Sequence, residues 1–354
     1  MRVLFISRAY PPVVGGIEKE NREIFNSLSK YLEVCLVANR RGKSFLPFFF
    51  VYALLKSAGM LRHYDVVLLG DGVACVLGRA LQMISRKPMI GIVHGLDLTY
   101  NNRLYQLLWI KQFIGRMDKL IAIGNETIIQ GVLRGIPRSK FVFVPDGVRV
   151  ERKVNRYTKN DLERLTNRKI KGKILLTLGR LVERKGIVWF VENVMVNLRD
   201  DIVYVVAGTG NEKNRLLAAI EKLEFKDRVI YVGGVSEQEK EMLYLTADIF
   251  VQPNITVEGD MEGFGLVVLE AASYGLPVVA SNIEGLKDAI HNGKNGFLLE
   301  ERDADAYKQK IESLFMDDES RRQFGANSRK YVEEHFSWER TARQYVNIFK
   351  ECVN

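Results

Sequence analysis

The sequence contains few cysteines and few prolines. Its three cysteines, at positions 35, 75 and 352 of 354 residues, are too few for a disulfide framework. Cys35 and Cys75 lie in apolar surroundings, where buried thiols are common. Eight prolines and 29 glycines exclude the collagen-like and low-complexity classes. The chain begins without a charged and then apolar leader, so we expect no export and a reducing cytoplasm.

Long apolar runs are also lacking. The stretch from Phe45 to Leu55 covers eleven residues, whereas a membrane-spanning helix needs about 20. Cations flank it on both sides: Arg40, Arg41, Lys43, Lys56 and Arg62. The pattern is typical of an anchor at the surface of an anionic membrane, or of a helix buried against a sheet.

The charge is unevenly distributed along the chain. With 47% hydrophobic and 27% charged residues, the protein is expected to be globular, and its length indicates two domains. The net charge of +9 divides into +11 over residues 1–150, +6 over 151–173 and −8 over the rest. The basic half therefore predicts an anionic partner: nucleic acid, a phosphorylated substrate or an acidic membrane surface.

Short β-branched runs alternate with helix-length spacers in two series. The predicted strands are 3–6, 34–38, 66–69, 90–93, 120–123 and 141–144, then 174–178, 203–207, 229–232, 249–252 and 278–280. Such runs favour parallel sheets with helical crossovers, and so an α/β fold of two doubly wound, Rossmann-like domains facing across a cleft. We place the domains at 1–165 and 166–335, with a C-terminal helix, 336–354, crossing back to the first. Ser236 to Glu239 predicts a helix start, and Gly325 predicts a helix break.

Two motifs that follow predicted strands could bind phosphate. Gly15 and Gly16 precede a predicted helix, whose N-terminal amides favour an anion, although a plain tight turn explains the pair equally well. Arg180 and Lys185 stand in the loop from Gly179 to Gly186, where a guanidinium and an ammonium suit a diphosphate. Solvated loop charges are the alternative for this second motif.

A third motif runs from Glu262 to Glu270. Gly263 and Gly265 are expected to open a helix beside Glu262. If helical geometry held from one glutamate to the other, their carboxylates would lie about 12 Å apart and could hold a ribose and a sugar. Glu270 lies among apolar residues and therefore needs a polar partner.

With these motifs the sequence resembles the family-4 retaining glycosyltransferases, the group-1 glycosyl transferases of the GT-B fold. Six motifs along nearly the whole chain carry the resemblance: Gly15 with Gly16, His94 to Asp97, Pro145 to Val148, Gly179 to Gly186, Glu262 with Glu270, and Phe336 to Trp338. The resemblance implies that His94, Arg180, Lys185 and Glu262 are catalytic. The donor site that it implies comprises Gly15, Gly16, Gly179, Arg180, Lys185, Gly208, Val235, Glu262, Gly263, Phe264, Gly265, Leu266 and Glu270.

The implied activity is hexosyl transfer from a UDP- or GDP-linked sugar to a glycan or lipid-linked acceptor in envelope or polysaccharide synthesis. The implied mechanism is retaining and independent of a metal or cofactor, with Arg180 and Lys185 neutralising the departing diphosphate. Asp146 departs from the asparagine frequent in the family, and the acidic loop Glu258 to Glu262 could instead be a hard-metal site.

We expect a cytoplasmic protein, peripheral to the membrane, without a nucleic-acid partner. Alternatives are a phosphorylase, a nucleotide-sugar epimerase, or a non-catalytic protein that binds nucleic acid or an anionic membrane.

Overall fold

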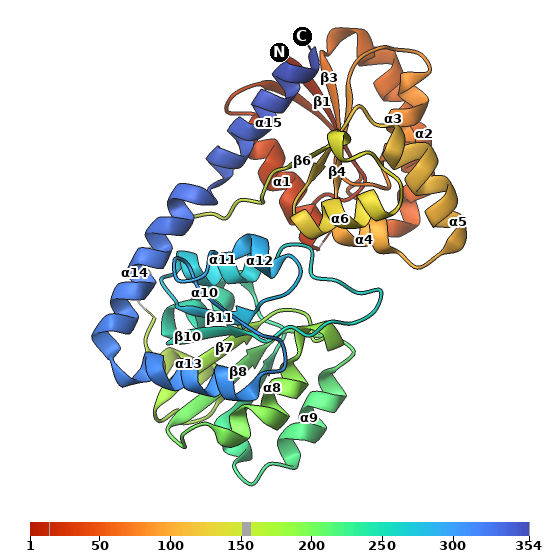
Figure 1. Ribbon diagram of the computed structural model, residues 1–354. Coiled ribbons are helices and arrows are strands. Elements are labelled where there is room, and N and C mark those ends of the chain that lie inside the picture. The colour runs from red at the N-terminus through yellow and green to blue at the C-terminus, as the bar shows by residue number, and fades with distance from the viewer. Residues whose placement is uncertain (14, 151–156, 354) are drawn as a thin grey trace. The chain divides into compact units, whose positions relative to one another are not determined.

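The computed structural model describes residues 1–13, 15–150 and 157–353. It divides into two compact units, the first formed by Met1–Gly147 with Ser337–Asn354 and the second by Val148–Phe336. Each unit contains a six-stranded sheet whose described neighbours pair in parallel, flanked by helices (Figure 1). The prediction of two doubly wound Rossmann-like domains is therefore confirmed.

The first unit has the strand order β2-β1-β3-β4-β5-β6. Its main elements are β1 (Arg2–Ser7), α1 (Gly16–Leu28), β2 (Glu33–Ala38), α2 (Leu46–Met60), β3 (Val66–Leu69), α3 (Cys75–Gln82), β4 (Met89–Val93), α4 (Gly95–Thr99), α5 (Arg103–Tyr105), the π-helix η3 (Gln106–Phe113), β5 (Lys119–Ala122), α6 (Asn125–Leu133), β6 (Phe141–Phe143) and α15 (Trp338–Val353).

The second unit has the strand order β12-β11-β10-β7-β8-β9. Its main elements are α7 (Lys159–Thr166), β7 (Lys173–Leu178), the 3-10 turn η6 (Glu183–Lys185), α8 (Ile187–Asn193), β8 (Ile202–Ala207), α9 (Lys213–Glu221), β9 (Val229–Gly233), α10 (Glu237–Thr246), β10 (Ile249–Gln252), α11 (Leu266–Ser273), β11 (Val278–Ser281), α12 (Leu286–Ala289), β12 (Phe297–Leu299), α13 (Ala304–Met316) and α14 (Asp318–His335).

All predicted strands are present, with ends displaced by one residue at most. The sequence did not reveal β12, because this short strand lies at the sheet edge and is only half buried. Edge strands lack the continuous apolar signal of central parallel strands.

The first unit ends at Gly147, earlier than the boundary predicted at 165. Helix α7, which the prediction assigned to the first domain, packs against α10 and β9 of the second unit. Helix α15 lies in the first unit beside α1, although more than 300 residues separate them in the sequence (Figure 1).

The helices of the first unit cover both faces of its sheet. Right-handed crossovers that run in one direction along the strand order place their helices on one face. One core cluster accordingly joins Phe49 of α2, Leu77 of α3, Ile110 of η3 and Ile128 of α6. The crossover from β1 to β2 runs in the opposite direction, so α1 and its neighbour α15 cover the other face.

The apolar stretch predicted at 45–55 belongs to a longer helical run. Lys43–His63 is the one described run that is long and apolar enough to cross a membrane, by length and composition. Only 22% of its most apolar window is buried. Phe49 and Ala53 pack in the core of the first unit, as expected of a helix buried against a sheet, whereas Phe48 and Leu55 on the same helix are exposed.

The helix break predicted at Gly325 is wrong. Helix α14 continues through this position, and the breaks lie at Asp317 and after His335. Gly325 is needed for packing instead, because a Cβ atom there would lie 2.0 Å from the carbonyl oxygen of Gly275.

Candidate functional site

Three neighbouring strands of the second unit end in glycine-containing loops. The amide of Gly179 donates to Ala207 O at 3.0 Å, and the amide of Gly208 donates to Gly233 O at 2.6 Å. Gly208 has φ 141°, and a Cβ atom there would lie 1.8 Å from Gly179 O. The predicted donor residues Gly179, Gly208 and Val235 therefore lie at the carboxyl edge of β7, β8 and β9, where ligands bind in open α/β sheets.

A buried cluster of charges lies beside this edge. Lys185, only 6% exposed, bonds through Nζ to Oε2 of Glu262. Arg184 donates from Nη1 to the same oxygen at 2.7 Å, and Asn254 donates from Nδ2 at 3.0 Å. The Glu262 carboxylate is thus fixed by three donors from two loops.

The cluster keeps Glu262 ionised. Burial opposes its charge, but Lys185 and Arg184 outweigh that effect and lower the pKa of Glu262 to about 2. Arg184 also pairs with Asp260 at 2.9 Å between Nε and Oδ1. Arg180 is exposed, and its charge helps to lower the pKa of Lys185, for which burial is the main cause. Lys185 is therefore enclosed, whereas Arg180 is open to a ligand.

A glycine-containing turn precedes α11, as the sequence predicted. Gly265 adopts φ 83°, and α11 begins at Leu266, so the amides of Leu266 and Val267 have no acceptor from a preceding turn, whereas the amide of Val268 donates to Gly265 O at 3.0 Å. Glu262 lies outside the helix, and its amide donates to Oε2 of Glu284 at 2.5 Å. The separation of about 12 Å expected for a continuous helix therefore does not apply. The Phe264 side chain is buried, which leaves its backbone as the group available to a ligand.

Glu270 has the polar partners that its apolar neighbourhood requires. It lies in the second turn of α11, where Lys240 of α10 donates to Oε1 at 3.1 Å and Tyr244 donates to Oε2 at 3.2 Å. Its side chain remains 20% exposed, so a further donor such as a hydroxyl can reach it.

The predicted residues of the first unit lie after β1 and β4. Helix α1 begins at Gly16, as predicted, and the amide of Lys19 donates to Gly15 O at 3.2 Å. A Cβ atom at Gly15 would lie 2.0 Å from the Glu18 carboxylate, so a larger residue there would have to displace that side chain.

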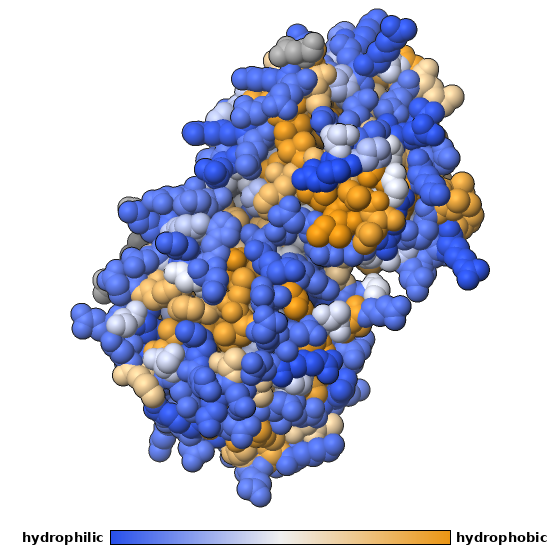
Figure 2. Space-filling view, viewed as in Figure 1, coloured by the Kyte–Doolittle hydropathy of each residue, from blue (hydrophilic) through white to orange (hydrophobic). Residues whose placement is uncertain are grey.

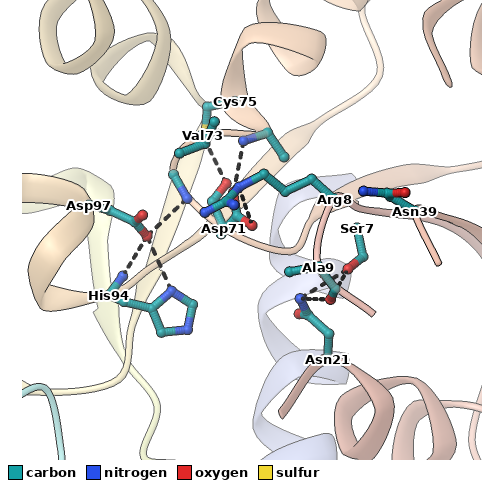
Figure 3. Close-up of polar contacts among 12 residues, drawn as sticks. Ser7, Arg8, Ala9, Asn21, Asn39, Asp71, Val73, Cys75, His94 and Asp97 are labelled. Carbon is teal, nitrogen blue, oxygen red and sulfur yellow. Dashed lines mark hydrogen bonds and ion pairs between the residues drawn. The ribbon is translucent and has the colours of Figure 1, made fainter. Parts of the chain in front are cut away.

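His94 is held between two carboxylates. Nδ1 lies 3.1 Å from Asp97 Oδ2, toward which the ring points in Figure 3, and Nε2 lies 2.9 Å from Glu20 Oε2. Burial favours the neutral ring, but Glu20 and Asp97 outweigh it and raise the pKa of His94 well above its usual value. Both ring nitrogens are engaged by carboxylates, an arrangement that favours the protonated ring.

Asp146, the residue that departs from the family pattern, adjoins this cluster. Burial, the Glu20 charge and a hydrogen bond to Glu20 raise the pKa of Asp146 well above its usual value. A protonated carboxyl group donates a hydrogen bond as an asparagine amide does. Arg8 and Asp71, which follow β1 and β3, pair nearby at 3.0 Å (Figure 3).

Arg184 and Glu20 are among the residues of these clusters that sequence reasoning missed. Arg184 stands next to Lys185 inside a motif that had been recognised, and Glu20 lies four residues after Gly16, on the buried side of α1. Their partners are distant in the sequence, so only the fold reveals the contacts.

The acidic loop that was considered as a metal site is engaged with cations. Asp260 and Glu262 both bond to Arg184. Among residues 1–13, 15–150 and 157–353, no group of three or more His, Cys, Asp or Glu side chains is arranged to hold a metal ion.

A family model for glycosyl transferases group 1 matches residues 159–331. An uncharacterised glycosyltransferase of Methanocaldococcus jannaschii is 25% identical to this chain. The alignment covers 99% of this chain and 98% of that protein. The Escherichia coli UDP-Gal:α-D-GlcNAc-diphosphoundecaprenol α-1,3-galactosyltransferase is 28% identical over 73% of this chain and 67% of its own length.

Solved structures of similar fold cover the chain almost completely. Sucrose-phosphate synthase from Thermosynechococcus elongatus superimposes with a TM-score of 0.79 at 20% identity, covering 99% of this chain and 98% of that one. Anabaena HepE in complex with UDP superimposes with a TM-score of 0.76 at 17% identity. This match covers 99% of the present chain and 100% of HepE. At these identities the likeness concerns the fold.

Proposed function

Because this chain is a group 1 glycosyltransferase with the GT-B fold, we propose that it transfers a hexosyl group from a nucleoside-diphosphate sugar with retention of configuration. The acceptor in this proposal is a hydroxyl group of a glycan or a lipid-linked sugar. Relatives named for capsular polysaccharide biosynthesis, for a diphosphoundecaprenol-linked sugar and for phosphatidylinositol monomannoside support that acceptor class.

The observation that carries the proposal is the grouping of cations, glycine amides and carboxylates at one sheet edge. Lys185 and exposed Arg180 supply positive charge for the diphosphate. The amides that open α11 supply donors for phosphate or sugar oxygens. Glu270, partly exposed in the next turn, is suited to hydroxyl groups of a ribose.

The proposed reaction exchanges one bond for another on the same face of the sugar. The bond from the anomeric carbon to the diphosphate breaks, and the acceptor oxygen forms the new bond. The acceptor proton passes to the departing phosphate oxygen, so no protein base is required. His94, with both ring nitrogens engaged, is suited to orient polar groups rather than to remove a proton.

Positive charge from the protein takes the place of a metal ion in this proposal. Fixed cations stabilise charge that grows on the leaving group without reorganisation during the reaction. Turnover should therefore persist in EDTA, and a loss of activity that Mg²⁺ or Mn²⁺ restores would contradict metal independence.

We further propose that α2 places the protein at the inner face of the cytoplasmic membrane. Phe48, Val51 and Leu55 are 62% to 69% exposed on this helix, and Lys56 lies beside them. Apolar side chains next to cations are typical of interfacial helices.

The test is product analysis with UDP- and GDP-linked hexoses and a lipid-linked or soluble glycan acceptor. We expect glycosylated product from one nucleotide class, with retained anomeric configuration by NMR. Sugar release that depends on inorganic phosphate would indicate a phosphorylase, and a free epimeric sugar nucleotide would indicate an epimerase.

A further inference from the structure

A large cavity lies on the first unit, and Gly15, Gly16 and His94 are not among its described lining residues. It has a volume of about 1030 Å³ and opens between the segment that contains α5 and η3 and the loop from α6 to β6. Five cations line it: Arg103, Lys111, Arg116, Arg134 and Lys140. None of its described lining residues is acidic.

No described carboxylate forms an ion pair with these cations, although the charge of Asp118 acts on Lys140 from a longer distance. In the described part of the chain, no ion pair joins any of the five to Asp or Glu. Arg134 bonds to the neutral side chain of Gln106, and Lys140 donates to the carbonyl oxygens of Gly115 and Met117, each at 2.8 Å. The positive charge of the cavity therefore remains available to an anion.

Exposed apolar side chains surround the same cavity. Leu107 and Leu133 line it, and Leu133 is 73% exposed. Leu104 and Leu108 are also exposed on the adjoining turns. Figure 2 shows this hydrophobic surface over α6 and its neighbours. A soluble anion would contact only the cations. An amphiphile with an anionic head would contact the cations with its head and the exposed leucines with its apolar part.

The surface continues across one face of the first unit. Helices α2, α3 and α6 and the π-helix η3 all pack on that face of the sheet, and each of them, or the turn that ends it, exposes large apolar side chains. The helices of the opposite face expose fewer such side chains: Tyr31, 40% exposed, in the turn that ends α1, and Val353 at the end of α15. The asymmetry indicates that this face meets an apolar phase.

We infer that the cavity binds the phosphate headgroup of an anionic membrane phospholipid, while the surrounding leucines enter the acyl region. The cations provide charge complementarity to the phosphate, and the leucines hold the lipid within its bilayer. The site is separate from α2, and it rests on neither nucleotide binding nor the sugar transfer proposed above.

The experiment is flotation of the full chain with phosphatidylcholine vesicles that contain or lack phosphatidylglycerol. The variant R103Q/K111Q removes two exposed cations of the cavity. Each cation near an anionic surface strengthens binding by about five-fold. We therefore expect the partitioning of this double variant onto anionic vesicles to fall by about 30-fold. Partitioning onto pure phosphatidylcholine should not change.

The matched control is R340Q/K350Q on α15, which changes the net charge equally on the opposite face. Its partitioning should stay within about two-fold of the wild type, because the attraction falls off within a Debye length. Equal losses in both variants would mean that overall charge drives binding, and the site would be rejected.

Two further arms separate the apolar contribution from the charge. L107S/L133S keeps every charge and should still weaken binding to anionic vesicles. Soluble glycerol phosphate should compete only weakly. Full competition by glycerol phosphate, together with unchanged binding of L107S/L133S, would identify a site for free phosphate and overturn the assignment to lipid.

Trp109 gives a readout that needs no change in the cavity. It lies in η3, and its indole donates to Val73 O at 3.3 Å. Phosphatidylglycerol brominated in its acyl chains should quench part of the tryptophan fluorescence, and Trp109→Phe should remove the quenched part. An unquenched wild-type protein that nevertheless floats with the vesicles would contradict the site. UDP or GDP binding, measured separately, should be unaffected in every variant.

Discussion

At the scale of single residues, each of the two clusters pairs buried groups of opposite charge. Glu262 is held by Lys185 and Arg184, and His94 is held by Glu20 and Asp97. The sequence pointed to Lys185 and Glu262 because each lies in a loop that follows a strand, and to His94 through the resemblance to the family. It did not point to the partners, since a contact between residues 77 or 74 positions apart leaves no local pattern.

Replacement of Lys185 by Ala should lower kcat/KM by about 10² to 10³, corresponding to about 3 to 4 kcal/mol of lost charge stabilisation. Some loss of stability should accompany it, because Glu262 stays buried with one cation fewer. The control is Lys222→Ala, which changes an exposed lysine of the same unit. Steady-state kinetics with the identified sugar nucleotide measures the effect, and wild-type rates for Lys185→Ala would remove the assignment.

The pKa of about 2 for Glu262 predicts an acid-sensitive fold. A carboxyl group whose pKa is lower in the folded state contributes stability above its unfolded value of 4.5, and this stability is lost as the pH falls toward 2. The contribution is on the order of 3 kcal/mol. Urea unfolding between pH 5 and pH 2 should show this loss in the wild type and a smaller slope in Glu262→Gln. Equal slopes would contradict the pairing.

The raised pKa of His94 predicts the opposite dependence on pH. The stabilisation is fully present below the unfolded value of 6.5 and is lost as the pH rises through the higher folded value. Histidine ring signals in NMR should place the titration of His94 well above 6.5. Glu20→Gln should lower it, because this substitution removes the largest favourable charge. An unperturbed titration of His94 would exclude the imidazolium.

At the scale of elements, the sequence predicted where strands begin and end better than where helices end. Parallel strands are buried on both faces, so each gives a continuous apolar run. Gly325 misled the prediction because glycine often ends helices, whereas here it permits close approach of the Gly275 backbone. Helix α7 misled it because polar composition does not reveal which sheet a helix packs against.

Two helical glycines give a matched test of that packing. Gly325→Ala should destabilise the fold by about 1 to 3 kcal/mol, because the added methyl group meets the Gly275 carbonyl. Gly59→Ala in α2 should be neutral or stabilising by up to about 1 kcal/mol, because its Cβ position is open. Thermal unfolding of both variants measures the difference, and equal effects would contradict the close contact at Gly325.

At the scale of the whole molecule, the chain joins two α/β units with different charge and chemistry. The first is basic, with an exposed apolar face and the cation-lined cavity. The second carries the cations and amides suited to a diphosphate. The sequence predicted this division of charge, but it did not reveal that the apolar surface extends across several helices, because its residues are scattered from 48 to 133.

Binding of nucleoside diphosphates to the full chain tests the central claim most directly. Titration calorimetry with UDP, GDP and ADP should give saturable binding of UDP or GDP, and Lys185→Ala and Glu270→Gln should weaken it at least ten-fold while Lys222→Ala leaves it unchanged. Absence of binding for all three nucleotides, or equal affinity in the wild type and in Lys185→Ala and Glu270→Gln, would contradict a diphosphate-sugar site at the carboxyl edge of the second sheet.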